Sequence, residues 1–154
     1  MTKEYFLRLY EHAIWANRSV LGGLRKQPQE NKRARALLNH VLAAEQVWIT
    51  RLCGQDSSAL PIWPDRSLDE CRALMEQNHS HYKQFLNDLT EESLGQAVTY
   101  KNSKGQEFHT PVRDILTHVA LHGTNHRGQI ATVVRDAGEE PVNTDYITFV
   151  REVG

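Results

Sequence analysis

Apolar side chains recur every three to four residues along four long stretches of this chain, and this period marks one face of an amphipathic α-helix. The predicted helices cover residues 3–24, 31–53, 67–89 and 110–137. Four helices of similar length that each carry one apolar face bury those faces best by packing side by side. The sequence therefore predicts an all-α fold, and more closely a four-helix bundle.

Local signals mark where three of the helices begin. Thr2 is a suitable N-cap for the first helix, and Ser67 with Glu70 has the S-x-x-E spacing of a capping box. Before the fourth helix, Thr110 is a predicted N-cap with Pro111 at the first helical position, where a proline costs no hydrogen bond. These residues place the starts of the first, third and fourth helices.

Two connections interrupt the helical pattern. Residues 55–66 contain two prolines and several turn-forming residues, so no regular structure is expected there. Between residues 96 and 109, β-forming residues flank the sequence Asn-Ser-Lys-Gly, which predicts a small hairpin in the long connection before the fourth helix. Thr144 or Asp145 could cap one or two further helical turns near the end.

The length of the chain suits one hydrophobic core, so we expect a single domain over residues 1–154.

The charge pattern excludes an obvious nucleic-acid binding surface. The 18 basic and 19 acidic residues give a formal net charge of -1 and are spread along the chain. No apolar run approaches the ~18 residues of a membrane helix, and no secretory leader is recognised. Cys53 and Cys71 do not form a CxxC pair. We therefore expect a soluble cytoplasmic protein that acts on a small molecule, without a nucleic-acid or membrane partner.

Three of the eight histidines, His118, His122 and His126, stand four residues apart in the predicted fourth helix. Residues at this spacing differ by about 40° in direction and about 6 Å in height, so the imidazoles project from one narrow face. The same face carries apolar residues, namely Ile115, Val119, Ile130 and Val133. This pattern predicts that the histidines point into the core.

A buried imidazole needs partners for both ring nitrogens, and a shared cation meets much of that need. His40 interrupts the apolar face of the second helix and is the candidate for a third ligand. The predicted metal ligands are therefore His40, His122 and His126, while His118 is expected to pack beside them. Three imidazoles and an open position are typical of catalytic zinc sites, and the divalent ion stays open among zinc, nickel, iron and manganese.

The alternative is a polar stripe of histidines that binds no metal in the cell. The remaining four histidines lie in more polar settings and are predicted to be surface or structural residues: His12, His79, His81 and His109.

Three segments of the chain carry a resemblance to a known family. The sequences YEHAIWAN, LLNHVLAAEQVWITRL and LTHVALHGTNHRGQI, together with the tail, resemble the DinB/YfiT-like family, whose members are four-helix bundles. The resemblance implies a divalent metal held by one histidine of the second helix and an H-x3-H pair of the fourth, here His40, His122 and His126. It also implies a homodimer. The family includes S-transferases and isomerases that work with low-molecular-weight thiols such as bacillithiol, mycothiol or glutathione.

An open metal position could hold such a thiol as the nucleophilic thiolate, which needs no catalytic protein cysteine. The expected function is thus a metal-dependent thiol S-transferase or isomerase. One alternative is a metal-dependent hydrolase, although the glutamate of an H-E-x-x-H motif is missing between His122 and His126. Another is a non-catalytic metal-binding or small-ligand-binding stress protein.

No catalytic residue is assigned from the sequence. Three residues are candidates for supporting the metal ligands: Glu45, His118 and Gln129. Glu45 could orient an imidazole or accept a proton, and the alternative is an ion pair with a basic residue at the edge of the bundle. Arg127 is a candidate for a structural salt bridge, Gly128 for close helix packing, and Gln129 could reach the cavity.

Overall fold

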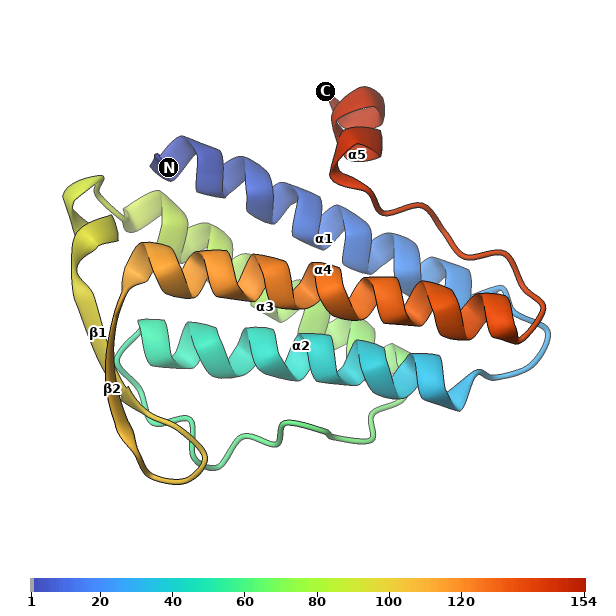
Figure 1. The fold of residues 1–154 in the computed structure, drawn as a ribbon, viewed down its shortest axis with the longest axis horizontal. Helices are drawn as coiled ribbons and strands as arrows, with labels where there is room; N and C mark the ends of the chain where they lie inside the picture. Colours follow the sequence, from blue (N-terminus) through green and yellow to red (C-terminus); the bar gives the residue numbers. More distant parts are fainter. Residues whose placement is uncertain (1) are drawn as a thin grey trace.

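A computed structural model describes residues 2–154 of the chain, and these residues are mostly helical (Figure 1). Its elements, in chain order, are α1 (Lys3–Arg25), α2 (Lys32–Leu52), α3 (Leu68–Asp88), the short 3-10 helix η1 (Glu92–Gly95), β1 (Ala97–Lys101), β2 (Glu107–Pro111), α4 (Val112–Asp136) and α5 (Tyr146–Val153). The four long helices lie within two residues of their predicted bounds. The two strands make the all-α description approximate, and α5 is a further short helix near the end of the chain.

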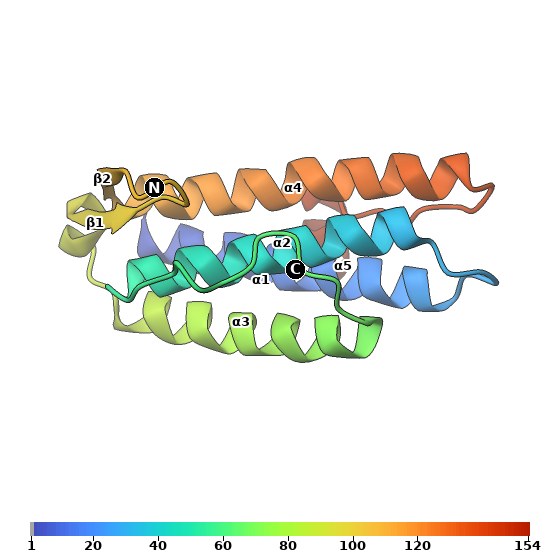
Figure 2. The same cartoon turned by 90° about the horizontal axis from the view of Figure 1, so that it is seen from below.

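The four long helices lie side by side, with α4 and α3 on opposite sides of the molecule (Figure 2). Helix α2 packs against α4 and α3, and α1 packs against the same two helices from the other side. The histidines of α2 and α4 therefore belong to neighbouring elements. None of the described helices combines the length and the apolarity needed to cross a membrane.

Two of the predicted helix starts are confirmed and one is wrong. The Thr2 hydroxyl accepts a hydrogen bond from Tyr5 N, and Ser67 and Glu70 form the predicted capping box. Thr110, in contrast, lies in β2, where its hydroxyl is 2.9 Å from the Tyr100 hydroxyl. The strand pairing continues to Pro111, so α4 begins one residue later and without a side-chain cap.

The predicted hairpin forms the end of the molecule at which α4 begins (Figure 1). Strands β1 and β2 pair antiparallel, and Gly105 adopts a φ of 78° in their turn. The Asn102 side chain accepts hydrogen bonds from Lys104 N and Gln106 N, which holds the turn closed. The Tyr100 ring lies 5.1 Å from that of Trp48, so the hairpin is fastened to α2.

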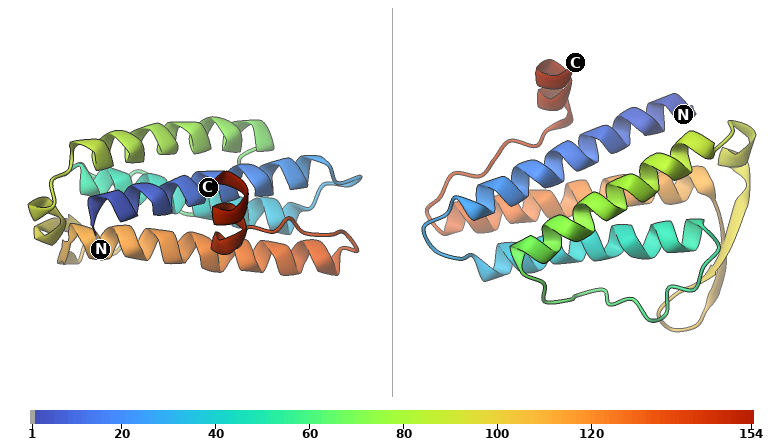
Figure 3. Two further views of the ribbon diagram at one scale, coloured as in Figure 1. Left: turned by 90° about the horizontal axis from the view of Figure 1, so that it is seen from above. Right: turned by 180° about the vertical axis from the view of Figure 1, so that it is seen from behind.

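Helix α5 stands apart from the other helices and lies beside α1 (Figure 3). It begins after Asp145, as predicted, but the structure shows no side-chain cap there. Phe149 is 1% exposed and packs against Trp15 and His12 of α1. His12 is thus a structural residue, and its Nε2 lies 2.8 Å from the Thr144 carbonyl oxygen.

The core consists of two apolar clusters with a polar layer between them. One cluster surrounds Leu38 and Met75, and the other surrounds Leu86 and Leu116. Between them, each long helix contributes one polar residue: Asn17, Glu45, Asn78 and Arg127. This polar layer lies at the level of the α4 histidines, because Arg127 directly follows His126.

Candidate metal centre

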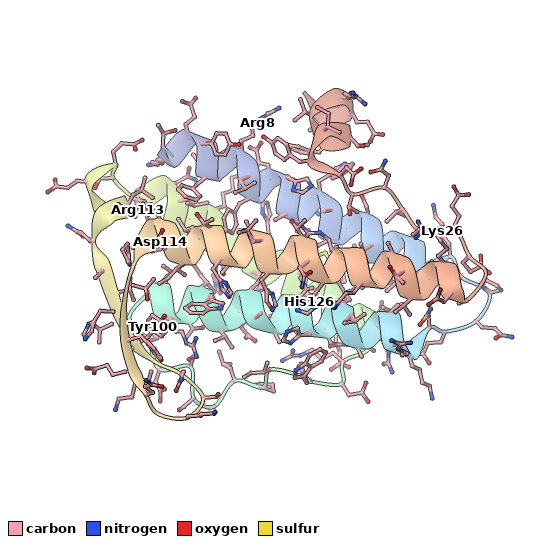
Figure 4. All side chains as sticks on the ribbon, in the orientation of Figure 1. Arg8, Lys26, Tyr100, Arg113, Asp114 and His126 are labelled. Atoms are coloured by element: carbon pink, nitrogen blue, oxygen red, sulfur yellow. The ribbon has the colours of Figure 1, made fainter. Side chains whose placement is uncertain are left out.

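His40, His122 and His126 come together between α2 and α4, where Figure 4 labels His126. One ring nitrogen from each lies within 4.8 Å of the others, and the Nε2 atoms of His40 and His122 are 3.1 Å apart. Two tetrahedral zinc ligands at 2.0–2.1 Å would be about 3.3 Å apart. The arrangement therefore fits a small divalent ion.

The helical spacing explains why the two α4 histidines meet one partner. Successive steps of four residues keep His122 and His126 on the side of α4 that faces α2, and their ring centroids are 4.5 Å apart. The His40 ring is 4.9 Å from His122 and 4.7 Å from His126, measured between centroids. His40 therefore contacts both.

The prediction that the α4 histidines point into the core is wrong for His118, which is exposed, and only partly right for His122 and His126, which are half-buried. The buried stripe of α4 mixes steps of three and four residues and includes Val112, Leu116, Val119, Gly123, Arg127, Ile130 and Val134. A row spaced by four drifts about 40° per step, so it leaves the core face. The histidines consequently lie at the partly exposed boundary between α2 and α4.

Hydrogen bonds at Nδ1 orient the rings of His40 and His126. His40 Nδ1 donates to the Ile62 carbonyl oxygen at 3.0 Å, and His126 Nδ1 donates to Gln129 Oε1 at 2.7 Å. A proton fixed on Nδ1 places the lone pair on Nε2, which is the usual arrangement of a metal-binding imidazole. Gln129 thus supports His126, as the sequence suggested for it.

The electrostatics of the site favour neutral imidazoles. Burial, followed by the neighbouring His126 and His40 rings, lowers the pKa of His122 to about 4. Burial also lowers the pKa of His40. Only the unprotonated ring can bind a metal, so both side chains are in the correct form at neutral pH.

The loop over residues 55–66 holds His40 in place, which the sequence did not indicate. The Trp63 ring stacks on the His40 ring at 3.8 Å and 6°, although Trp63 is 59% exposed. Asn39 anchors the loop end by donating to the Arg66 carbonyl and accepting from Arg66 N. Figure 1 shows the loop running along α2. Only the fold brings these residues to His40, so no local pattern could have identified them.

Glu45 contacts neither a ligand imidazole nor a basic residue at the molecular edge. Its carboxylate accepts hydrogen bonds from Asn17 Nδ2 at 2.9 Å and from Asn78 Nδ2 at 3.4 Å. Burial raises its pKa, while the hydrogen bond from Asn17 and the charge of Arg127 oppose that rise. Glu45 therefore belongs to the polar layer of the core.

Arg127 is the buried cation of that layer and lies directly beneath the α4 histidines. It is 4% exposed, and its Nη1 donates to Asn17 Oδ1 at 2.8 Å. Its Nη2 donates to Thr124 Oγ1 at 3.3 Å. The sequence suggested an ion pair for Arg127, but a neutral amide bridges it to Glu45. The prediction that Gly128 allows close helix packing is wrong, because a Cβ at this position would meet nothing within 4 Å.

His118 lies one turn away from the three clustered histidines. Its ring centroid is 5.8 Å from that of His122 and 5.4 Å from that of Trp48. It is exposed and lies between the candidate metal centre and the hairpin.

Comparisons with known proteins identify the family of the chain. A family model described as the DinB family matches residues 1–152. The chain is 28% identical to Protein DinB of Bacillus subtilis strain 168, over 93% of this chain and 92% of that protein. Its fold is similar to the crystal structure of a DinB-like protein from Bacillus cereus ATCC 10987, with a TM-score of 0.65, 16% identity, and coverage of 92% of this chain and 97% of that chain. Since the family model spans nearly the whole sequence, the chain belongs to the DinB family.

Proposed function

We propose that this protein is a four-helix bundle that binds one divalent metal ion through His40, His122 and His126 and acts on a low-molecular-weight thiol. The observation that carries the proposal is the convergence of three imidazole nitrogens within 4.8 Å of one another. Three protein ligands leave a position for a further ligand, which is typical of catalytic rather than structural zinc sites.

When bound, the metal would favour the thiolate form of a thiol at its open position. The thiolate sulfur would then attack an electrophilic carbon, forming a C–S bond as the leaving group departs with the bonding electrons. In an isomerase, the same bond would form and later break, returning the thiol. His118 borders this position and is exposed, so it could exchange the released proton with solvent.

The cysteines of the chain support an external thiol as the nucleophile. Cys71 is buried, and burial raises its pKa to about 11. Cys53 is exposed, but partial desolvation raises its pKa as well. A raised pKa keeps each side chain in the less reactive thiol form at neutral pH.

Hydrolysis receives less support from the site. A hydrolase needs a general base close to the bound water, and the turn between His122 and His126 holds Gly123, Thr124 and Asn125 instead of a glutamate. Glu45 is engaged in the core by Asn17. A non-catalytic metal-binding protein is the second candidate, because the three histidines would serve that role equally well.

Turnover with a thiol separates the two candidates. Metal-loaded protein should accelerate the reaction of a thiol with a fluorogenic alkylating agent, and both chelation and His122→Ala should abolish the acceleration. His81→Ala is the control, because it removes an exposed imidazole from α3 and leaves His118 and the three proposed ligands in place. Stoichiometric metal without acceleration across a panel of thiols would favour the binding protein, and equal rates in His122→Ala would contradict the proposal.

A further inference from the structure

Arg51 lies near the end of α2 against two aromatic rings that also contact each other. Its guanidinium carbon is 4.6 Å from the centroid of the Trp48 ring and 5.2 Å from that of the Tyr100 ring, and the two ring centroids are 5.1 Å apart. Its Nε donates to the hydroxyl of buried Ser57 at 3.0 Å. The two ring contacts and this hydrogen bond hold the guanidinium in place.

This guanidinium has no counter-ion. Within residues 2–154, no carboxylate oxygen lies within ion-pair distance of Arg51. Its side chain is nevertheless half-buried, and the loss of water lowers its pKa. By comparison, Arg35 at the opposite end of α2 is paired with Glu30 and Asp65. An ordered guanidinium without a partner suits the two-point binding of a carboxylate, phosphate or sulfonate.

A row of aromatic rings connects the candidate metal centre to Arg51. From His122, the His118 ring and then the Trp48 ring follow, with centroids 5.8 and 5.4 Å apart in turn. Trp48 lies eight residues after His40, about 12 Å along the α2 axis. Figure 4 labels His126 between α4 and α2, and Tyr100 further along toward the hairpin.

We infer that Arg51, packed against Trp48 and Tyr100, is an anion-binding subsite for the ligand of the metal centre. The ligand would place its metal-binding atom at the three histidines and an anionic group at Arg51, which lies eleven residues after His40, about 16 Å along the α2 axis. Trp48 and His118 would line the stretch between the two ends. This inference rests on the proposed function, and it selects extended anionic thiols over neutral or short ones.

Thiols that differ in length and in one terminal group test the subsite. Cobalt(II)-loaded protein is titrated with 8-mercaptooctanoate and 8-mercaptooctanol, and binding is followed by the visible absorption of the cobalt. Wild type should bind the acid at least about tenfold more tightly than the alcohol, as expected for one charge-assisted interaction. The shorter pair, 3-mercaptopropionate and 3-mercaptopropanol, should show no such preference, because neither molecule reaches Arg51.

Arg51→Gln should abolish the preference for the long acid, whereas Arg51→Lys should retain part of it. Arg135→Gln is the control, because it removes an exposed arginine near the far end of α4. Cobalt content and thermal unfolding of each variant show that the site and the fold are intact. Thiol binding with an unchanged preference in Arg51→Gln would overturn the subsite and leave the metal site standing. Stoichiometric cobalt that binds no thiol in wild type would overturn both proposals.

Discussion

Gly123 makes room inside α4 for the guanidinium of Arg127. A Cβ at position 123 would stand 2.9 Å from Arg127 Nη1, which is held in the core by Asn17. Gly128, one turn later, has open space. We expect Gly128→Ala to stabilise the protein by up to about 1 kcal/mol, the usual advantage of alanine in a helix. Gly123→Ala should lose that advantage and destabilise, because it displaces a buried cation.

Urea unfolding of the two glycine variants beside wild type measures the difference directly. Both variants make the same chemical change in the same helix, so helix propensity cancels between them. Equal midpoints for Gly123→Ala and Gly128→Ala would show that Arg127 does not need the space at position 123.

Titration of His122 should make the metal-free protein sensitive to acid. The unfolded state takes up a proton near the ordinary pKa of 6.5, whereas the folded state resists protonation until about 4. Protonation in this window therefore favours unfolding, so the free energy of unfolding should fall as the pH drops from about 6.5 to about 4. His122→Asn should reduce this slope, and His118→Asn should leave it unchanged. Identical slopes in all three proteins, measured with a chelator present, would exclude His122 as the cause.

At the scale of elements, α5 depends on one anchor. Phe149 is 1% exposed, while Ile147 on the same helix is 52% exposed. Phe149→Ala should undock α5 and cost up to about 3 kcal/mol, the lower end for a buried phenylalanine, because the short helix can detach without unfolding the rest. Hydrogen exchange should show faster exchange confined to α5 in Phe149→Ala. Ile147→Ala should exchange like wild type, and faster exchange throughout the long helices would contradict a local role.

The elements themselves could largely be predicted from local sequence. The caps formed by Thr2, Ser67 and Glu70 bond backbone groups within three residues. Their roles could therefore be predicted from sequence alone. The predicted N-cap role of Thr110 was wrong because its hydroxyl lies beside that of Tyr100, ten residues away on the paired strand. Pairing of the two strands, which local sequence does not reveal, places Thr110 in β2 instead of at the start of α4.

Part of the candidate metal centre could also be predicted from local sequence, and part depends on tertiary packing. The spacing of His122 and His126 is a local property of one helix, and His40 stood out as a polar residue on an apolar face. Trp63 and Asn17 approach the site region only through tertiary packing. The burial of the histidines was overestimated, because a row spaced by four drifts away from a stripe spaced by three and four.

At the scale of the whole molecule, the polar layer joins all four long helices. We expect Arg127→Met to destabilise the protein by about 1–3 kcal/mol, because it removes the donor to buried Asn17 and the positive charge near half-buried Glu45. The loss should be larger at pH 8 than at pH 5. Burial already raises the Glu45 pKa, and without Arg127 it rises further, so the folded variant holds a proton that is released as the pH increases.

The double variant Glu45→Gln/Arg127→Met is the control for this interpretation. It removes both charges and should lose the added pH dependence of Arg127→Met. Chemical unfolding at the two pH values, arranged as a double-mutant cycle, gives the coupling between the residues. Additive effects at both pH values would show that Asn17 does not transmit the interaction between the two charges.

The metal content of the purified protein tests the central claim most directly. Protein prepared without an affinity tag should carry close to one divalent ion per chain by plasma mass spectrometry, and His118→Ala should match it. His40→Ala, His122→Ala and His126→Ala should each lose most of the metal while remaining folded by circular dichroism. Unchanged metal content in those three variants, or no metal in wild type even after loading, would contradict the assignment of the three histidines as a metal centre.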